Sequence, residues 1–387
     1  MLNTGHDNLP IALLGMVLAF ALAAALTPLG IKVAWRLDIV DRPRGNKLHA
    51  RPTPLMGGVA MAVAFLAVAL LWVARFDQWG NAQLRGLLVG CFLAALLGFL
   101  DEWLTLRPLQ HFIGQILVVL AAIWAAFPHV EKLSNPFATA WETQHGRGSF
   151  YLAWLVDHNS INHENTPVIG IAFTVFWIVG MMNTVNFLDG LDGLAGGVGA
   201  IGALFLGLWS LVMTDVYLAP THANQNIVLP LILCGAILGF LIFNWAPARV
   251  FMGDSGAMFI GFALGALSIF GPVKFGTWLL IMVVPIIDVA WAIVRRLMGR
   301  RSFASGDKHH IYHRMLELGL SRQSVVLIFY GLCFVLGIID LNLYKRQKVE
   351  AFVIVAVLSA AGAVLLEVRG RRAESLARSV GKRADAG

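Results

Sequence analysis

The chain has 387 residues, of which 58% are hydrophobic and only 13% are charged. This composition leaves too little polar surface to coat a soluble globule, so lipid must cover most of the protein. The net charge of +7 at pH 7 comes from basic loops between apolar stretches, which excludes nucleic acid as a partner.

Apolar stretches long enough to cross a bilayer recur along the chain. Crossing the hydrocarbon takes roughly 20 residues as a helix. The sequence therefore predicts an all-α integral membrane protein of about eleven transmembrane helices, near residues 11–28, 55–74, 84–100, 110–127, 167–183, 194–213, 226–243, 254–271, 275–294, 323–340 and 350–367. Residues 1–367 are expected to form one polytopic membrane domain, and residues 368–387 a basic cytoplasmic tail.

Lysine and arginine gather in alternate loops, six of them in residues 29–54, seven in residues 295–322 and six after residue 368. Because basic loops stay on the cytoplasmic side, this bias places the N-terminus outside and the C-terminus in the cytoplasm. One loop disagrees, since Lys345, Arg346 and Lys348 fall on the outer side. Either the bias is broken there or one of the last helices is wrongly placed.

The first polar cluster comprises residues 41–54, followed by two glycines at 57 and 58. Lys47, His49 and Arg51 are candidate donors to a phosphate, and the glycines permit close approach of the backbone. The alternative is a basic anchor at the membrane surface.

The second cluster is Asp101-Glu102, at the end of the predicted helix 84–100. Carboxylates at a helix C-terminus oppose the macrodipole and adjoin hydrocarbon here, so the pair indicates a function. In the alternative interpretation Asp101 only caps the next turn.

The third cluster places polar residues at every third position: Asn183, Asn186, Asp189 and Asp192. Positions three apart are neighbours on a helix, whereas the two Asp-Gly pairs favour turns. We expect a helix end that unwinds into a compact loop with two amides and two carboxylates. A pair of simple turns is the alternative.

The fourth cluster runs from residue 244 to residue 256 and contains Asp254 at the start of an apolar helix. Asp254 is either an N-cap or a ligand for a cation beside a helix N-terminus that attracts phosphate. The last basic loop adds three histidines within five residues, His309, His310 and His313, which form a candidate anion site amid arginines if partly protonated. A zinc site there lacks the carboxylate of an HExxH helix.

Carboxylates, amides and basic groups on one membrane face suit phosphoryl transfer. Mg²⁺ takes oxygen ligands and bridges carboxylates to substrate phosphates, and Mn²⁺ is the alternative ion. Two anionic reactants react only after metal and cationic side chains screen their charges.

Five stretches resemble the polyprenyl-phosphate N-acetylhexosamine-1-phosphate transferases: DRPRGNKLHARPTPLMGG, FLDEW with the downstream IGQ, NTVNFLDGLDGLAGG, NWAPARVFMGDSG and DKHHIYHRMLELGLS. They occur in family order between residues 41 and 321. The resemblance implies Mg²⁺-dependent transfer of a sugar 1-phosphate from a UDP-N-acetylhexosamine to undecaprenyl phosphate, with release of UMP, at the bacterial inner membrane.

The resemblance also implies roles for particular residues. Asp101 and Glu102 match an Asp-Asp pair that activates the lipid phosphate or helps organise Mg²⁺, and Asp254 matches the metal-binding aspartate. The other matched residues are assigned to catalysis or to substrate and metal binding, namely Asn183, Asn186, Asp189, Asp192, His310, Tyr312, His313, Arg314, Lys47 and His49.

Three residues depart from the family pattern. Glu102 replaces an aspartate, Tyr312 replaces the middle histidine of a His-x-His-His motif, and His111 stands where lysine or arginine is expected. The form of the last stretch favours a GlcNAc-type enzyme that initiates a cell-surface glycan such as O-antigen. UDP-MurNAc-pentapeptide remains an alternative donor.

A transporter or flippase is the alternative of another class. Transporters place ionisable residues near the bilayer midplane on broken helices, whereas these carboxylates are predicted at helix ends on one face. A homodimer, and either a direct or a two-step transfer through an enzyme aspartate, are compatible with the sequence.

Overall fold

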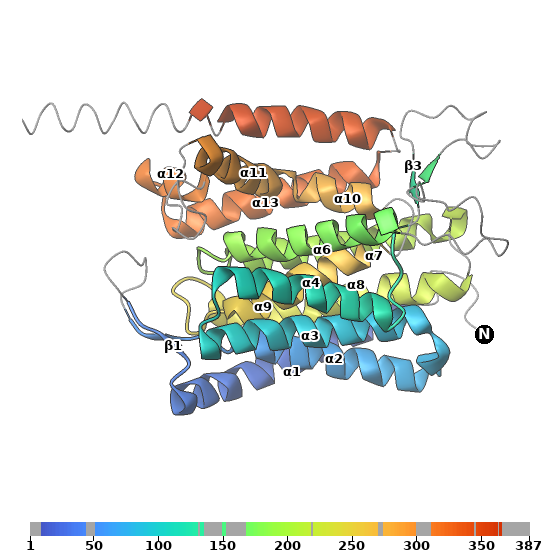
Figure 1. Cartoon of the computed structure of the whole chain (residues 1–387), viewed down its shortest axis with the longest axis horizontal. Coiled ribbons are helices and arrows are strands. Elements are labelled where there is room, and N and C mark those ends of the chain that lie inside the picture. The colour runs from blue at the N-terminus through green and yellow to red at the C-terminus, as the bar shows by residue number, and fades with distance from the viewer. Residues whose placement is uncertain are drawn as a thin grey trace, which may run out of the picture.

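The computed structural model describes residues 9–43, 51–130, 132–134, 149–151, 168–217, 220–269, 274–298, 311–343, 346–362 and 364–365. Most of these residues are helical (Figure 1). The helices are α1 (Leu9–Leu37), α2 (Gly57–Arg75), α3 (Ala82–Leu104), α4 (Pro108–Trp124), α6 (Val168–Leu188), α7 (Leu194–Tyr217), α8 (Pro220–Asn244), α9 (Gly253–Leu267), α10 (Lys274–Ile281), α11 (Val283–Met298), α12 (Ile311–Glu317) and α13 (Arg322–Leu341), followed by a helical segment at 346–362.

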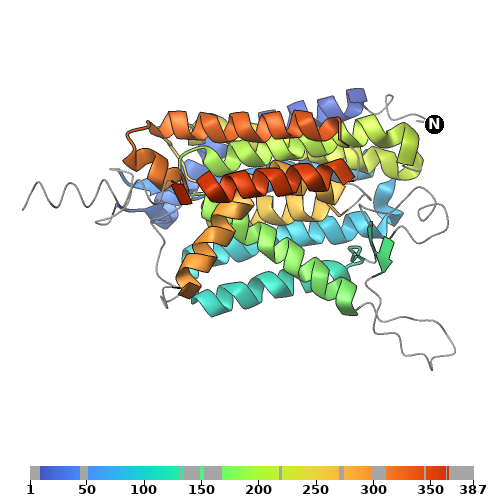
Figure 2. The same cartoon turned by 90° about the horizontal axis from the view of Figure 1, so that it is seen from above.

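The predicted all-α membrane architecture is confirmed. Within the described ranges, seven helices are long and apolar enough to cross a membrane, namely α1, α2, α3, α6, α7, α8 and α13. Helices α4 and α9 are apolar but shorter, and the predicted span 275–294 is divided at Met282 into α10 and α11. In the turned view α11, in orange, slants away from its neighbours (Figure 2). The total of eleven spans and the orientation stay predictions.

Two short antiparallel hairpins mark the two ends of the bundle. Strands β1 (Val40–Asp41) and β2 (Thr53–Pro54) pair at the end that also carries α12, whereas β3 (Lys132–Ser134) and β4 (Ser149–Tyr151) pair near the N-terminus at the other end (Figure 1). The helices between them run roughly side by side. We call the end with β1 and α12 the site end.

Helix boundaries follow local chemistry. The Asn81 side chain accepts a hydrogen bond from Leu84 N at the start of α3, and the Ser321 side chain accepts one from Ser324 N at the start of α13. Such caps satisfy N–H groups that have no partner inside the helix. Pro108 starts α4, where its missing N–H costs nothing.

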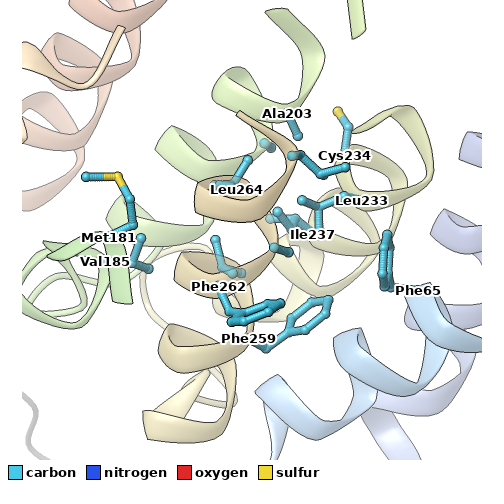
Figure 3. Packing of buried hydrophobic residues seen from close by; sticks show 14 of the residues in the cluster. Phe65, Met181, Val185, Ala203, Leu233, Cys234, Ile237, Phe259, Phe262 and Leu264 are labelled. Atoms are coloured by element: carbon cyan, nitrogen blue, oxygen red, sulfur yellow. The ribbon is translucent and has the colours of Figure 1, made fainter. Parts of the chain in front are cut away.

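Helix α9 is the centre of the core. Its residues from Ser255 to Leu267 are all buried, as expected for a helix that is apolar on every side. Figure 3 shows Phe259 and Phe262 of α9 among side chains of α2, α6 and α8, and the Phe259 ring lies 5.5 Å from that of Phe65. Because α9 is surrounded, its N-terminus is held firmly at the site end.

The basic loop that conflicts with the charge rule contains a buried charge. Lys348 Nζ lies 2.7 Å from Asp340 Oδ2 and 2.8 Å from Thr277 Oγ1, and it lies over the Trp209 ring. The two charged side chains are 3% and 1% exposed. Lys348 therefore neutralises an internal carboxylate and is not an ordinary loop charge, which explains part of the disagreement.

This ion pair gives a stability prediction. Lys348→Met should destabilise the protein by about 3–5 kcal/mol, because it leaves the Asp340 carboxylate buried and unpaired. The double variant Lys348→Met/Asp340→Leu should recover most of that loss, because both charges are then absent. Thermal unfolding of the three proteins in detergent measures the difference. An equal loss in the single and double variants would contradict the assignment.

Candidate active site

The site is built where α3 meets the N-terminus of α9. A Cβ atom on Gly98 would lie 2.3 Å from the backbone carbonyl carbon and oxygen of Asp254, so the two backbones can be this close only because residue 98 is glycine. Asp101 follows Gly98 by three residues and therefore lies on the same face of α3. This spacing brings the Asp101 carboxyl group to Asp254.

Asp101 caps the turn after α3, as one interpretation of the sequence suggested, and it also lies in a polar cluster with His111 and Asp254. Its Oδ1 accepts a hydrogen bond from Leu106 N at 2.9 Å, which caps the turn after α3. Its Oδ2 lies 3.3 Å from His111 Nδ1, and its carboxyl group lies close enough to that of Asp254 for the two to interact. The Asp101 side chain is 14% exposed. It is thus a nearly buried carboxyl group between an imidazole and a second carboxyl group.

Glu102 is turned toward the first turn of α9. Its Oε1 accepts hydrogen bonds from Ser255 N at 3.0 Å and from Ser255 Oγ at 3.2 Å. Its Oε2 is buried and lacks a hydrogen-bond partner in the described part of the chain. A carboxylate beside the unpaired N–H groups of a helix N-terminus is favourable. Glu102 thus ties α3 to α9 next to Asp254.

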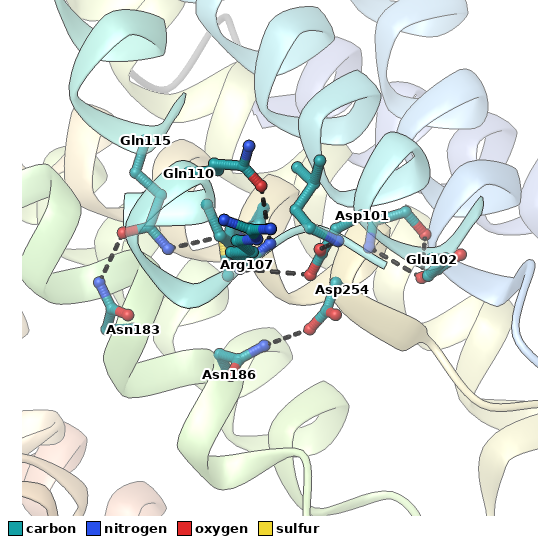
Figure 4. A network of polar contacts seen from close by, with 12 residues as sticks. Asp101, Glu102, Arg107, Gln110, Gln115, Asn183, Asn186 and Asp254 are labelled. Carbon is teal, nitrogen blue, oxygen red and sulfur yellow. Dashed lines mark hydrogen bonds and ion pairs between the residues drawn. The ribbon is translucent and has the colours of Figure 1, made fainter. Parts of the chain in front are cut away.

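Asp254 does not cap α9, which corrects one interpretation of the sequence. The cap position is Met252, and Asp254 lies in the first turn. Its Oδ1 accepts a hydrogen bond from Asn186 Nδ2 at 2.5 Å, which links α9 to α6 (Figure 4). The carboxylate is therefore positioned by two helices and contributes no backbone cap.

Asn183 lies one helical turn before Asn186 and faces α4. Its Nδ2 donates to Gln115 Oε1 at 2.7 Å and to Val179 O at 2.8 Å (Figure 4). Gln115 in turn donates to Met258 Sδ at 3.3 Å. Because both amide hydrogens of Asn183 have protein acceptors, only its carbonyl oxygen is left for the predicted substrate contact.

The predicted helix end and compact loop are confirmed in part, because Asn183 and Asn186 still lie on the helix and only Asp189 and Asp192 are in the loop. Helix α6 ends at Leu188, and residues 189–193 form turns before α7 begins. Asp192 Oδ2 accepts from Ala248 N at 3.0 Å, and Gly193 N donates to Asn244 Oδ1 at 2.9 Å. Gly193 has a φ of +82°, a conformation that glycine adopts without strain. These bonds fix the loop against the segment that precedes α9.

Two carboxyl groups lie close together in this loop. Burial raises the pKa of Asp189 well above its usual value, and the carboxylates of Asp254 and Asp192 raise it further. Asp189 and Asp192 also line a pocket of about 330 Å³. The remaining lining residues are Asp41, Leu55, Gly190, Leu191, Asn244, Phe251, Gly253 and Arg322. The pocket opens beside Asp254, because Gly253 is part of its wall.

The glycines at 57 and 58, which were predicted to let the backbone approach a phosphate, lie instead against another stretch of backbone. Gly57 N donates to Phe251 O at 3.1 Å and Gly58 N to Met252 O at 2.9 Å. A Cβ on Gly58 would lie 2.0 Å from Gly256 N. The two glycines therefore pack against the segment that leads into α9.

Helix α12 brings part of the last basic loop to the site. A Cβ atom on Gly190 would lie 2.1 Å from the Tyr312 hydroxyl, so Tyr312 packs directly on the Asp189 loop. The His313 ring stacks on Tyr312 with centroids 4.4 Å apart. Arg314 is buried and pairs with Glu317 at 2.7 Å. Lys47, His49 and His310 lie outside the described residues.

The residues suit a magnesium ion that takes part of its ligands from substrate and water, and they do not suit an ion held by protein ligands alone. No group of three or more His, Cys, Asp or Glu side chains in the described ranges could hold an ion by itself. Mg²⁺ needs only one or two carboxylates when substrate phosphates and water complete its shell. Asp254, with the Asn186 amide beside it, offers this partial set of oxygen ligands.

Comparisons with known proteins identify the family. A family model described as glycosyl transferase family 4 matches residues 84–272. The decaprenyl-phosphate N-acetylglucosaminephosphotransferase of Mycobacterium leprae is 33% identical over 346 residues, which cover 83% of this chain and 80% of the relative. The chain belongs to the polyprenyl-phosphate N-acetylhexosamine-1-phosphate transferases. It is therefore an enzyme, a phosphotransferase of the membrane.

Two further relatives show how broad this transferase family is. The phospho-N-acetylmuramoyl-pentapeptide-transferase of Oceanobacillus iheyensis is 31% identical over 342 residues, covering 83% of this chain and 95% of the relative. A Bacillus subtilis protein named as a probable undecaprenyl-phosphate N-acetylglucosaminyl 1-phosphate transferase is 28% identical over 353 residues, covering 89% and 88%. The relatives thus differ in the named sugar and share the phosphate transfer.

The transferase site contains residues that the sequence did not single out. Ser255 and Gln115 hold Glu102 and Asn183, and Arg322 lines the pocket. Asp288 is 3% exposed and accepts a hydrogen bond from Ile311 N. The sequence alone could have pointed to Asp288, because a carboxylate inside an apolar helix is uncommon and indicates a function.

Proposed function

We propose that this transferase moves GlcNAc-1-phosphate from UDP-GlcNAc to undecaprenyl phosphate at the cytoplasmic face of the bacterial inner membrane. An oxygen of the lipid phosphate attacks the β-phosphorus of the donor, and the bond between that phosphorus and the bridging oxygen breaks. UMP leaves with that oxygen, and a lipid-linked diphosphate sugar remains. The observation that carries this proposal is the meeting of Asp101, Asn186 and Asp254 beside the pocket lined by Asp189 and Asp192.

Asp254 and Asn186 would hold Mg²⁺, with Mn²⁺ as an alternative ion. The bound ion would neutralise the phosphate charge that develops during transfer. Asp101 accepts a proton from the lipid phosphate, and His111 at 3.3 Å keeps its carboxylate oriented. Glu102 supports catalysis by holding Ser255, and with it the first turn of α9, in place.

The pocket lined by Asp189 and Asp192 suits the nucleotide sugar. Its volume of about 330 Å³ lies within the range of small-molecule sites. The residues proposed to contact the phosphates are Lys47, His49, His310, His313 and Arg314. Tyr312, which packs on Gly190, is proposed to contact the sugar. Each of these contacts supplies a hydrogen-bond donor to an anionic or hydroxylated substrate.

The choice of GlcNAc rests on two observations. The chain's last basic stretch has the form DKHHIYHR, and the Mycobacterium leprae and Bacillus subtilis relatives are both named for N-acetylglucosamine. The Oceanobacillus relative is named for a muramoyl-pentapeptide, which makes UDP-MurNAc-pentapeptide the competing donor. The product would initiate a cell-surface glycan.

The test is transfer by the purified enzyme with undecaprenyl phosphate and a panel of UDP-sugars. We expect a lipid-linked product with UDP-GlcNAc in the presence of Mg²⁺, complete loss of product on adding EDTA, and recovery on restoring Mg²⁺. Product from UDP-MurNAc-pentapeptide alone would overturn the choice of sugar. Undiminished transfer in EDTA would overturn the metal requirement.

A further inference from the structure

Asp288 is a buried carboxylate to which the proposed reaction gives no part. It lies in α11, in the interior of an apolar stretch, and only 3% of its surface is exposed. A carboxylate is costly to bury in such surroundings unless its charge is used. Its Oδ1 accepts a hydrogen bond from Ile311 N at 2.8 Å, 23 residues further along the chain.

Ile311 is the first residue of α12, so the bond satisfies one of the N–H groups that a helix start leaves without an internal partner. A bond from a backbone N–H to a carboxylate is charge-assisted and stronger than a neutral one. The described part of this helix is seven residues long, and a helix segment of this length depends on contacts with the rest of the protein. Asp288 therefore supplies a contact that α12 needs.

A second contact is made by Tyr312, the next residue. It is 4% exposed, and its hydroxyl lies against Gly190, where any Cβ atom would collide with it. Helix α12 is thus held on one side by α11 and on the other by the loop that carries Asp189. His313 stacks on the held Tyr312 ring.

We propose that Asp288 is a positioning residue, which fixes Ile311 at the start of α12 and so places Tyr312 and His313 against the Asp189 loop. This inference rests on the proposed function, because it assumes that Tyr312 and His313 contact substrate. Asp288 itself touches no reacting atom in this account. It acts through the Ile311 N–H.

The first test measures hydrogen exchange without substrates, so it does not depend on transfer. In Asp288→Ala the backbone amides of α12 should exchange on the order of tenfold faster, because one charge-assisted bond is lost. Asp288→Asn keeps an oxygen that can accept the bond and should restore most of the protection. Asp77→Ala, the same change at an exposed aspartate at the other end of the bundle, is the matched control and should leave α12 unchanged. Equal exchange in wild type and Asp288→Ala would overturn the proposal.

The second test is a double-mutant cycle in the transfer assay. Asp288→Ala should raise the KM for the UDP-sugar and lower kcat, and Asp288→Asn should recover both. In the His313→Ala background, Asp288→Ala should have little further effect, because both changes remove the same contact. The same loss in both backgrounds would overturn the positioning role. Absence of transfer by the wild-type enzyme would instead overturn the proposed function, and the exchange result would still decide whether Asp288 anchors α12.

Discussion

Asp254→Asn should lower the rate of sugar-phosphate transfer by about 10²–10³-fold, the loss typical when one group that stabilises transition-state charge is removed. The substitution is nearly isosteric, and the new amide oxygen can still accept the bond from Asn186 Nδ2. What disappears is the negative charge that would hold Mg²⁺. The measurement is the initial rate of lipid-linked product formation at saturating UDP-GlcNAc.

The matched control for Asp254 is Asp77→Asn, the same change at an exposed aspartate between α2 and α3, at the end of the bundle away from the site. We expect its rate to stay within twofold of wild type. Raising the Mg²⁺ concentration should restore part of the activity of Asp254→Asn, because a weakened site can be filled by mass action. Full activity of Asp254→Asn at low Mg²⁺ would remove this residue from the site.

Gly98→Ala should lower the rate by about 10²-fold, the size of effect that follows from misplacing a catalytic group by about 1 Å. The added methyl group would meet the Asp254 backbone at 2.3 Å and Ser255 N at 2.4 Å, so the N-terminus of α9 must shift away from α3. The shift would separate Asp254 from Asp101. The cost in stability should be about 1–3 kcal/mol, as for other overpacked positions.

The control for Gly98 is Gly180→Ala in α6, where an added Cβ atom meets nothing within 4 Å. This variant should transfer at the wild-type rate and unfold at an equal or higher temperature, since alanine favours a helix. Comparing transfer per folded molecule in the two variants separates displacement of Asp254 from a general loss of protein. A Gly98→Ala enzyme with wild-type rate would show that α9 does not need this close approach.

Much of the site could be predicted because its polar residues stand out in an apolar chain. Asp101, Asn186 and Asp254 are far apart in sequence, yet each was expected at a helix end on the same membrane face, and the structure brings them into one network. The membrane-spanning helices could be predicted because a run of roughly 20 apolar residues in a bilayer has few alternatives to forming a helix. The unwinding after Leu188 followed from the two Asp-Gly pairs.

The partners of these residues could not be predicted, because they depend on how helices pack. Nothing in the sequence pairs Glu102 with Ser255 or Asn183 with Gln115, and the resemblance to an Asp-Asp pair suggested that Glu102 helps activate the lipid phosphate or organise Mg²⁺. Lys348 was counted as a loop charge because its contact with Asp340 is visible only after α13 and the 346–362 helix are packed. The bond that Asp288 makes could not be predicted, because its partner is a backbone N–H, which every residue has.

The most direct test of the account uses UDP-GlcNAc that carries ³²P in the β-phosphate. Purified enzyme, undecaprenyl phosphate and Mg²⁺ should move the label into the lipid fraction and release unlabelled UMP in equal amount. This result is expected because the attack is at the β-phosphorus, so the labelled phosphate leaves with the sugar. Label that stays in released UDP while the sugar reaches the lipid would show attack at the sugar carbon and contradict the account.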